Sequence, residues 1–391
     1  MNERAALETL LRLGPLSRDE LDRSIGLSKP AAADLLRRLE VSGLVCRSGL
    51  KPVSGPGPQA QLWSANVRAG YAAGISVGAN SVSVAIADLG DDVVAADRRP
   101  LRATHHDPVD VVRAAVTRAA ETAALSLDDL AHTVVGIQGS VDPSTGHLEY
   151  AMHLPWWQGF DVEQHLSDAL GGPVTVENDV NLVTIDEVAT GSGRNRRDVI
   201  LLWMSHGVAV ASIVDGRLVR GGRGGAGEID HLRIPTGTGP PEPIAALLTN
   251  HAVTTLAQRF GASGSTVAST VRRAVRTSPQ FVDALAGRVA AAAVGAVALL
   301  DPELVILAGD VAVAAGEPLA ARTENLLHET LAHRPQVAVA GGTTDSVRQG
   351  ALHAAVRIAR ERVFGRGVAV PGGHIPFSLA APDRRKDRMR A

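Results

Sequence analysis

The sequence predicts an α/β protein in three parts: a small helical module, a larger region of strands alternating with helices, and a polar tail. The first 66 residues show helical apolar spacing followed by two short strand patterns. From Gly70 onward, apolar strands alternate with segments of helix length. The chain has 391 residues, which is too long for one ordinary domain. We therefore expect domains at residues 1–66 and 67–371 and a disordered tail at 372–391.

Composition excludes several classes of protein. The single cysteine, Cys46, rules out a disulfide framework and a site of several thiolates within one chain. The formal net charge is -2, so contact with a nucleic acid needs a local basic patch. The first residues lack the basic and then apolar run of a signal peptide. The most apolar helical stretch, residues 289–300, looks too short to span a bilayer. We expect a cytoplasmic protein without membrane contact.

The N-terminal module begins with three helices whose ends carry local signals. Residues 5–13 have apolar side chains at helical spacing, and glycine and proline follow. Ser17 with Glu20 is a capping-box pattern for a second helix, which ends at Gly26. Ser28 is expected to cap a third helix that has Pro30 near its first turn. Two short strands at 44–46 and 61–63 flank a stretch rich in proline and glycine.

This order of elements is typical of a winged helix-turn-helix, whose third helix enters the major groove of DNA. From Ser28 to Lys51 there are five bases and two acids, a local net charge of +3. Three side chains near the start of the third helix are expected to face bases, and Ser28 and the cations to meet phosphate. The candidate DNA-binding residues are Ser28, Lys29, Ala32, Ala33, Arg37, Arg38, Arg47 and Lys51. The alternative is a small protein-interaction module with solvated arginines.

The second region contains one pattern of three strands twice. Residues 72–77, 81–87 and 93–96 read as strands joined by tight turns, and the same cadence returns at 199–204, 208–214 and 217–219. A helix-containing segment follows each unit. The repetition predicts two similar lobes with a cleft between them.

Several separate segments resemble the ROK family of repressors and sugar kinases, over nearly the whole chain. The resemblance rests on glycine-rich, acidic and histidine-containing motifs at residues 74–80, 136–142, 154–157, 177–181, 225–231 and 301–309. It implies a two-lobed, actin-like (RNase H-like) sugar kinase fold behind the winged helix-turn-helix. By analogy with the family, Asp179 would be the catalytic base.

The segments of this chain that match the family's phosphate-binding loops differ from the family in sequence. Phosphoryl transfer needs a base, donors around the phosphates and a metal held by a carboxylate. Ser76 stands where the family has an aspartate, and Ala79-Asn80 replaces Gly-Thr. Residues 205–211 contain valines and alanines in place of a glycine-rich run, so their Cβ atoms are expected to block phosphate. The turn near the adenosine reads Ala308-Gly309, where the family has Gly-Gly. We expect no ATP-dependent kinase activity and therefore no catalytic residue.

The sugar side keeps more of the family pattern. The candidate ligand-binding residues are Asn178, Asp179, Glu228 and His231, which are of the types that bind vicinal hydroxyls. Asp230 departs from the glycine of the family. The alternative is structural: Asn178 caps a helix, and Glu228 is an ordinary ion-pair partner. The three cysteines that bind zinc in the family have no counterpart at residues 235–243, so we expect no metal and no cofactor.

These features together predict a transcriptional repressor that senses a sugar or sugar phosphate and binds double-stranded operator DNA. One alternative is a DNA-binding protein whose second domain only dimerises, and another is an active ATP-dependent sugar kinase. A homodimer or tetramer is expected because paired half-sites multiply affinity. The helical segments 281–300 and 347–363 are candidate packing surfaces, although both could equally lie in the core.

Overall fold

The computed structural model describes residues 2–52, 59–101, 107–149, 151, 154–235, 239–341 and 345–365. The predicted tail at 372–391 lies outside these residues. The chain divides into two compact units. Within the described ranges, the first comprises residues 2–135, 163–175 and 352–365, and the second residues 136–162 and 176–351.

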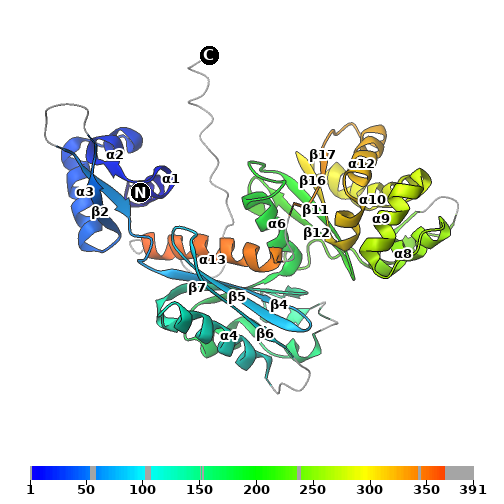
Figure 1. Cartoon of the computed structure of the whole chain (residues 1–391), viewed down its shortest axis with the longest axis horizontal. Helices are drawn as coiled ribbons and strands as arrows, with labels where there is room; N and C mark the ends of the chain where they lie inside the picture. The colour runs from blue at the N-terminus through cyan, green and yellow to red at the C-terminus, as the bar shows by residue number, and fades with distance from the viewer. Residues whose placement is uncertain are drawn as a thin grey trace, which may run out of the picture. The chain divides into compact units, whose positions relative to one another are not determined.

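The N-terminal module consists of three helices and a three-stranded sheet of order β1-β3-β2 (Figure 1). Its elements are α1 Asn2–Leu13, β1 Leu16–Ser17, α2 Arg18–Ile25, α3 Lys29–Val41, β2 Val45–Leu50 and β3 Gln61–Ala65. The Glu20 carboxylate accepts hydrogen bonds from the backbone N–H of Ser17 at 2.9 Å and from its hydroxyl at 2.6 Å. Gly26 ends α2 with a φ of 73°, a backbone conformation that favours glycine. The expected ends of α2 are therefore confirmed.

The larger sheet of the first unit has the order β10-β7-β4-β5-β6. Its strands are β4 Tyr71–Val77, β5 Ser81–Asp88, β6 Val93–Pro100, β7 Leu130–Ile137 and β10 Val174–Asn178. Helix α4 Pro108–Thr122 packs on β5 and β6, and α13 Ser346–Phe364 lies along the sheet (Figure 1). A side chain at Gly74 would overlap the backbone of Leu352, so the glycine permits this close packing. The smaller elements are η1 Leu127–Asp129, β8 Ser140–Val141, β9 Leu148–Glu149, η2 Pro155–Trp157 and α5 Val162–Leu170.

The second unit is built on a sheet of order β13-β12-β11-β16-β17. Its strands are β11 Val199–Met204, β12 Val208–Val214, β13 Arg217–Leu218, β16 Leu304–Ala308 and β17 Gln336–Val339. The helices are α6 Asp179–Ala189, α7 Ala245–Leu248, α8 Asn250–Arg259, α9 Val267–Thr277, α10 Pro279–Leu300, α11 Gly309–Ala315 and α12 Glu317–Thr330. A two-stranded ribbon joins β14 Arg233–Ile234 to β15 Glu242–Pro243. Each large sheet contains three antiparallel strands in succession, so the predicted repeat is confirmed.

Helix α10 extends the expected helical segment 281–300 to Pro279. It has 22 residues, and within the described part of the chain it alone is long and apolar enough to cross a membrane by length and composition. The expectation of a stretch too short to span a bilayer was wrong for the whole helix, because it counted only the most apolar run at 289–300. Phe281, Leu285, Val289 and Val297 are fully buried, which makes α10 a core helix of the second unit.

Candidate functional site

The N-terminal end of α3 presents an exposed face. Ser28 precedes the helix with extended backbone, but its side chain makes no capping hydrogen bond. Lys29 and Ala33 are exposed, as expected for residues that face a partner. Ala32 is fully buried, so the expectation that it contacts bases was wrong. Successive residues of a helix point about 100° apart, and this turns Ala32 toward the core while Ala31 and Ala33 stay outside.

The other predicted DNA-binding cations are held by acids on the module's surface. Their contacts are Arg37–Asp34 at 2.7 Å, Arg38–Asp34 at 2.7 Å, Arg47–Glu40 at 2.9 Å and Lys51–Glu20 at 2.5 Å. Arg47 also lies 5.3 Å from the centre of the Trp63 ring. Exposed ion pairs are weak, so a phosphate can displace these acids at little cost. Lys29 forms no ion pair with any described residue.

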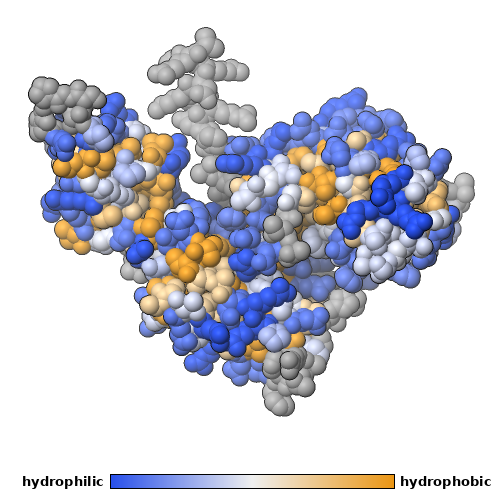
Figure 2. Space-filling view, viewed as in Figure 1, coloured by the Kyte–Doolittle hydropathy of each residue, from blue (hydrophilic) through white to orange (hydrophobic). Residues whose placement is uncertain are grey.

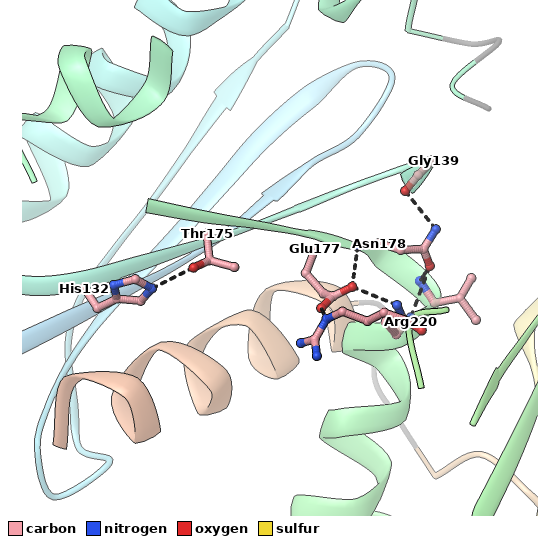
Figure 3. Close-up of polar contacts among 8 residues, drawn as sticks. His132, Gly139, Thr175, Glu177, Asn178 and Arg220 are labelled. Carbon is pink, nitrogen blue, oxygen red and sulfur yellow. Dashed lines mark hydrogen bonds and ion pairs between the residues drawn. The ribbon is translucent and has the colours of Figure 1, made fainter. Parts of the chain in front are cut away.

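Asn178 holds the start of α6 in the second unit (Figure 3). Its Oδ1 accepts hydrogen bonds from the backbone N–H groups of Val180 at 2.9 Å and Asn181 at 3.2 Å. Its Nδ2 donates to the carbonyl of Gly139 at 2.9 Å. Gly139 has a φ of 98°, and a Cβ there would overlap the carbonyl of Glu149. The helix-capping role that we gave as the alternative for Asn178 is therefore confirmed, with one amide hydrogen left for a ligand.

Glu177 precedes this cap and is 7% exposed. Its Oε1 accepts from the backbone of Asn178 at 3.0 Å and from the side chain of Asn181 at 2.7 Å. Its Oε2 accepts from Nε of Arg220 at 2.7 Å (Figure 3). Sequence reasoning missed Arg220. A buried acid needs a hydrogen-bond or ion-pair partner. No local sequence pattern shows that the partner is Arg220, because it lies 43 residues away in the sequence.

The glycine-rich segment after Arg220 brings Glu228 to strand β12. The backbone N–H of Val210 donates to the carbonyl of Gly227 at 2.9 Å, and Ala209 pairs with Glu228 in an isolated bridge. Gly227 has a φ of 91°, and a side chain there would overlap the carbonyl of Val210. The segment therefore depends on this glycine to lie against the strand.

Two of the predicted ligand-binding acids have raised pKa values. Loss of hydration raises the pKa of Asp179 to about 7, and the charge of Glu228 adds to the rise. Loss of hydration also raises the pKa of Glu228, with a contribution from Asp230. The charge of Glu228 thus reaches Asp179, the residue that follows Asn178. His231 is exposed, and no hydrogen bond or ion pair joins it to the other three residues in the described ranges.

The turn between β11 and β12 differs from our expectation. Val208 and Val210 are 2% and 7% exposed and belong to the core of the second unit, so their side chains do not block the turn. The expectation that they do was wrong, because the alternation of the strand turns them inward. Instead, the Val208 backbone N–H donates to Oδ1 of Asp230 at 2.7 Å. An amide that could bind phosphate is thus already paired with a carboxylate.

The remaining departures from the kinase pattern are spread over both units. Ser76 lies in β4, where it pairs with Ser83. Ala308 is fully buried. Gly309 follows with a φ of 87°, and a Cβ there would overlap the backbone of Met204, so both the conformation and the space favour glycine. Within the described ranges, no three histidine, cysteine, aspartate or glutamate side chains gather into a possible metal site. The ribbon of β14 and β15 is held by Arg233, which donates to the carbonyl of Pro241 at 2.7 Å.

Comparison with known families and proteins gives three kinds of similarity. The model of the ROK family matches residues 72–357. The xylose repressor of Bacillus spizizenii is 24% identical over 241 residues, which are 60% of each of the two proteins. The match therefore spans less than two thirds of that repressor.

Solved structures show the same fold at low identity. A ROK family transcriptional regulator, described as a homologue of the E. coli MLC protein, has a TM-score of 0.72 at 17% identity. The match covers 93% of this chain and 97% of that one. A ROK hexokinase from Thermus thermophilus has a TM-score of 0.62 at 22% identity, over 73% of this chain and 97% of the hexokinase. These likenesses establish the α/β architecture.

Proposed function

We propose, from the premise that this chain belongs to the ROK family, that it is a DNA-binding repressor controlled by a sugar or sugar derivative. In this proposal the kinase-like part binds the ligand and does not phosphorylate it. The observation that carries the proposal is the module of α1, α2, α3 and the β2–β3 hairpin ahead of the family match, with the start of α3 exposed.

The DNA-binding end is a winged helix-turn-helix in this proposal, with α3 as the recognition helix. Its first turn carries the exposed Ser28 and Lys29, and the positive end of the helix dipole lies there. When DNA binds, three arginines leave the carboxylates with which they pair and contact DNA phosphates instead: Arg37, Arg38 and Arg47. The match to the ROK regulator covers 93% of this chain against 73% for the hexokinase, which supports a part shared with regulators.

The ligand-binding end is the cluster at the start of α6. Asp179 and Glu228 together present acceptors for sugar hydroxyls, and Asn178 keeps one amide donor. Above its pKa of about 7 the Asp179 carboxylate is ionised, and a hydrogen bond from a hydroxyl to an ionised carboxylate contributes about 1.5–3 kcal/mol. For a ligand to control DNA binding, it must bind one conformation of the protein more tightly than another. We propose His231 as a further contact that forms only with ligand.

Loss of kinase chemistry is supported by charge as well as by sequence. The carboxylate of Asp230 accepts from the Val208 amide and adds negative charge beside the β11–β12 turn. A phosphate there would meet an anion instead of a free N–H. Ser76 in β4 also lacks the negative charge that helps to place a hydrated magnesium ion.

The full-length protein provides the test. Selection from a pool of random duplexes should enrich one sequence, and a panel of neutral sugars and sugar phosphates should contain a compound that changes its affinity for that duplex. Asp179→Ala and Glu228→Ala should keep duplex binding and lose the response. ADP release with a sugar that disappears in Asp179→Asn would overturn the proposal, and so would a selection that enriches nothing.

A second function is favoured by one specific observation. Asn178 is largely used as a helix cap, so the α6 cluster could serve folding alone while the ROK domain only dimerises. In that case Asp179→Ala and Glu228→Ala would be unstable, and no compound in the panel would alter duplex affinity.

A further inference from the structure

We propose that helix α9 of the second unit presents a docking surface for an acidic segment of another protein. Residues 243–282, which include α7, α8 and α9, contain four arginines and no aspartate or glutamate, although the whole chain has a net charge of -2. Three of these arginines, Arg272, Arg273 and Arg276, belong to α9 and form what we call the α9 cationic face. This inference goes beyond the proposed function and does not depend on it.

The three arginines lie on one side of the helix. Successive residues turn by about 100°, so positions 272, 273 and 276 together span about 100° of its circumference. All three are exposed, whereas Val271 and Ala274 are fully buried. Figure 2 shows a strongly hydrophilic area on the visible face where Figure 1 labels α9. The α9 cationic face is therefore a compact set of cations open to solvent.

This face lacks the acids that neutralise other helices of the protein. Within the described part of the chain, none of its three arginines forms an ion pair. Several arginines elsewhere have an acid one helical turn away, in the pairs Arg4–Glu8, Arg38–Asp34 and Arg357–Glu361. The first acid after α9 is Asp283, and its carboxylate accepts from Arg322 at 2.6 Å. Carboxylates for the α9 cationic face must therefore come from outside these residues.

Placing three cations together opposes the stability of the helix. Arg272 and Arg276 are four positions apart, and Arg273 and Arg276 are three apart, spacings at which like charges repel each other on a helix. Arg276 lies in the last turn, where the helix dipole favours a cation. The dipole does not explain Arg272 and Arg273, which lie in the middle of this 11-residue helix. A partner with several carboxylates would remove the repulsion.

The helix holds these side chains in a fixed frame. Thr266 caps its start, where its hydroxyl oxygen accepts from the backbone N–H of Ser269 at 3.1 Å. Neighbours three or four positions apart on a helix have Cβ atoms about 5–6 Å apart, and each guanidinium can donate two parallel hydrogen bonds to one carboxylate. The face therefore fits a row of carboxylates, whereas a single small anion would neutralise only part of it.

The composition of α9 favours a protein partner over a nucleic acid or a membrane. The helix has no aromatic residue on which bases can stack. Its apolar residues are buried or partly buried, so none is free to insert into a lipid surface. Arginine clusters that bind acidic motifs need neither feature. Arg272 also lines a cavity that Ala308 lines, so the variants below leave Arg272 unchanged.

Two labelled helical peptides test the class of partner with the full chain. Both have an alanine-based sequence, and one carries glutamates one turn apart where the other carries glutamines. Fluorescence anisotropy should show the glutamate peptide binding at least about tenfold more tightly, because each carboxylate gains a cation. Its affinity should fall as salt is added. Arg273→Gln/Arg276→Gln should remove most of the difference between the peptides.

Two other arginines of the second unit provide the matched control. Arg217 and Arg334 are exposed and form no ion pair in the described ranges. Arg217→Gln/Arg334→Gln removes the same charge and should bind both peptides like the wild type. Should the double variant of α9 fail to fold, Arg273→Gln alone keeps Arg276 at the helix end and should still weaken binding of the glutamate peptide.

The proposal is overturned by equal affinity for the two peptides, by unchanged binding in the α9 variant, or by an equal loss in the control. It is also overturned if the α9 variant loses binding to phosphatidylglycerol vesicles or to a random duplex but keeps its affinity for the glutamate peptide. Duplex selection and the sugar panel, run on the same preparations, separate it from the proposed function. Peptide binding without any duplex or sugar response would leave the docking surface standing and remove only the regulator.

Discussion

Two acids only two positions apart, Glu177 and Asp179, show how surroundings decide the behaviour of a carboxylate. Glu177 is buried but receives three hydrogen bonds, one of them from the cation Arg220. Asp179 accepts only from the backbone N–H of Val180 among the described hydrogen bonds, and it feels the charge of Glu228. Donors satisfy the buried oxygens of Glu177, whereas loss of hydration next to another acid raises the pKa of Asp179.

The first prediction concerns the pH dependence of stability at Asp179. The pKa of about 7 in the folded protein lies above the ordinary aspartate value of 3.8, so the folded protein binds more protons between these two values. Stability is therefore favoured below pH 3.8 and falls as pH rises toward about 7. Asp179→Asn should lack this fall, so the variant should gain on the wild type across the interval. Urea unfolding at a series of pH values measures it.

The control for this prediction is Asp128→Asn, which changes an exposed acid of the first unit. Its free energy of unfolding should follow that of the wild type at every pH. Parallel curves for the wild type and Asp179→Asn would show that the carboxylate is hydrated in the folded protein.

The second prediction concerns the ion pair between Arg220 and Glu177. Arg220→Met leaves the Glu177 carboxylate buried without its cation and should lower the free energy of unfolding by about 1.5–3 kcal/mol. It should also weaken the response to sugar, because Glu177 holds Asn178 and Asn181 in place. Urea unfolding and the ligand-dependent gel shift are the two measurements.

Arg223→Met is the matched variant, since Arg223 is exposed in the same glycine-rich segment. It should change stability by no more than about 0.5 kcal/mol. Equal unfolding of the two variants would mean that the pair contributes nothing beyond a surface contact.

At the scale of elements, the buried and exposed faces of α3 follow from one rotation. Ala32, Leu35, Leu36 and Leu39 are buried, and the residues between them are outside or partly exposed. The pattern leaves Lys29 and Ala33 on one side of the helix start. Substitution of single residues on this exposed face can test whether it contacts DNA.

The third prediction separates base contact from phosphate contact on α3. Lys29→Ala should relax or weaken recognition of the selected duplex. Arg38→Ala should weaken binding to all duplexes alike and lower the salt slope by about 0.9, as expected when one phosphate contact is lost. Gel shifts over a range of salt concentrations measure both effects.

Arg12→Ala, at the exposed end of α1, serves as the control and should bind like the wild type. A deletion of residues 1–66 should bind no DNA. Unchanged affinity in this deletion would place the DNA-binding surface elsewhere in the chain.

At the scale of the whole molecule, two helical segments were considered as packing surfaces for a dimer. The segment 347–363 lies in α13, where Leu352 and Ala359 are buried, which favours the core position that we gave as the alternative. Helix α10 buries one face, with Phe281 in the core, whereas Leu299 is 85% exposed at its end. Both alternatives therefore stay open for α10. A dimer or larger assembly of this chain stays a prediction, which rests on the proposed DNA-binding function.

The fourth prediction is that the protein acts as a dimer or a larger assembly. One winged helix reads a short site, and linking two of them raises affinity through effective concentration by about 10²–10⁴. Light scattering should give at least two chains per particle, and a duplex with paired half-sites should bind far more tightly than one half-site. A monomer that binds a single half-site with full affinity contradicts this.

Local signals in the sequence determined the order of the elements, the ends of the N-terminal helices and the repeated three-stranded units. Capping boxes, glycines with positive φ and apolar periodicity act within a few residues, so a single sequence reveals them. The same signals predicted Asn178 and Asp179 at the start of α6. They also predicted a helix at 281–300, which the structure extends only to Pro279.

Only the tertiary structure decided which distant groups meet. It paired Glu177 with Arg220 and the Val208 amide with Asp230, and it turned Val208 and Val210 into the core. Such contacts join residues far apart in the chain, and their partners depend on how strands stack and loops close. A buried polar group must find a donor or acceptor, but the sequence does not say which one, because many similar groups compete and packing selects among them.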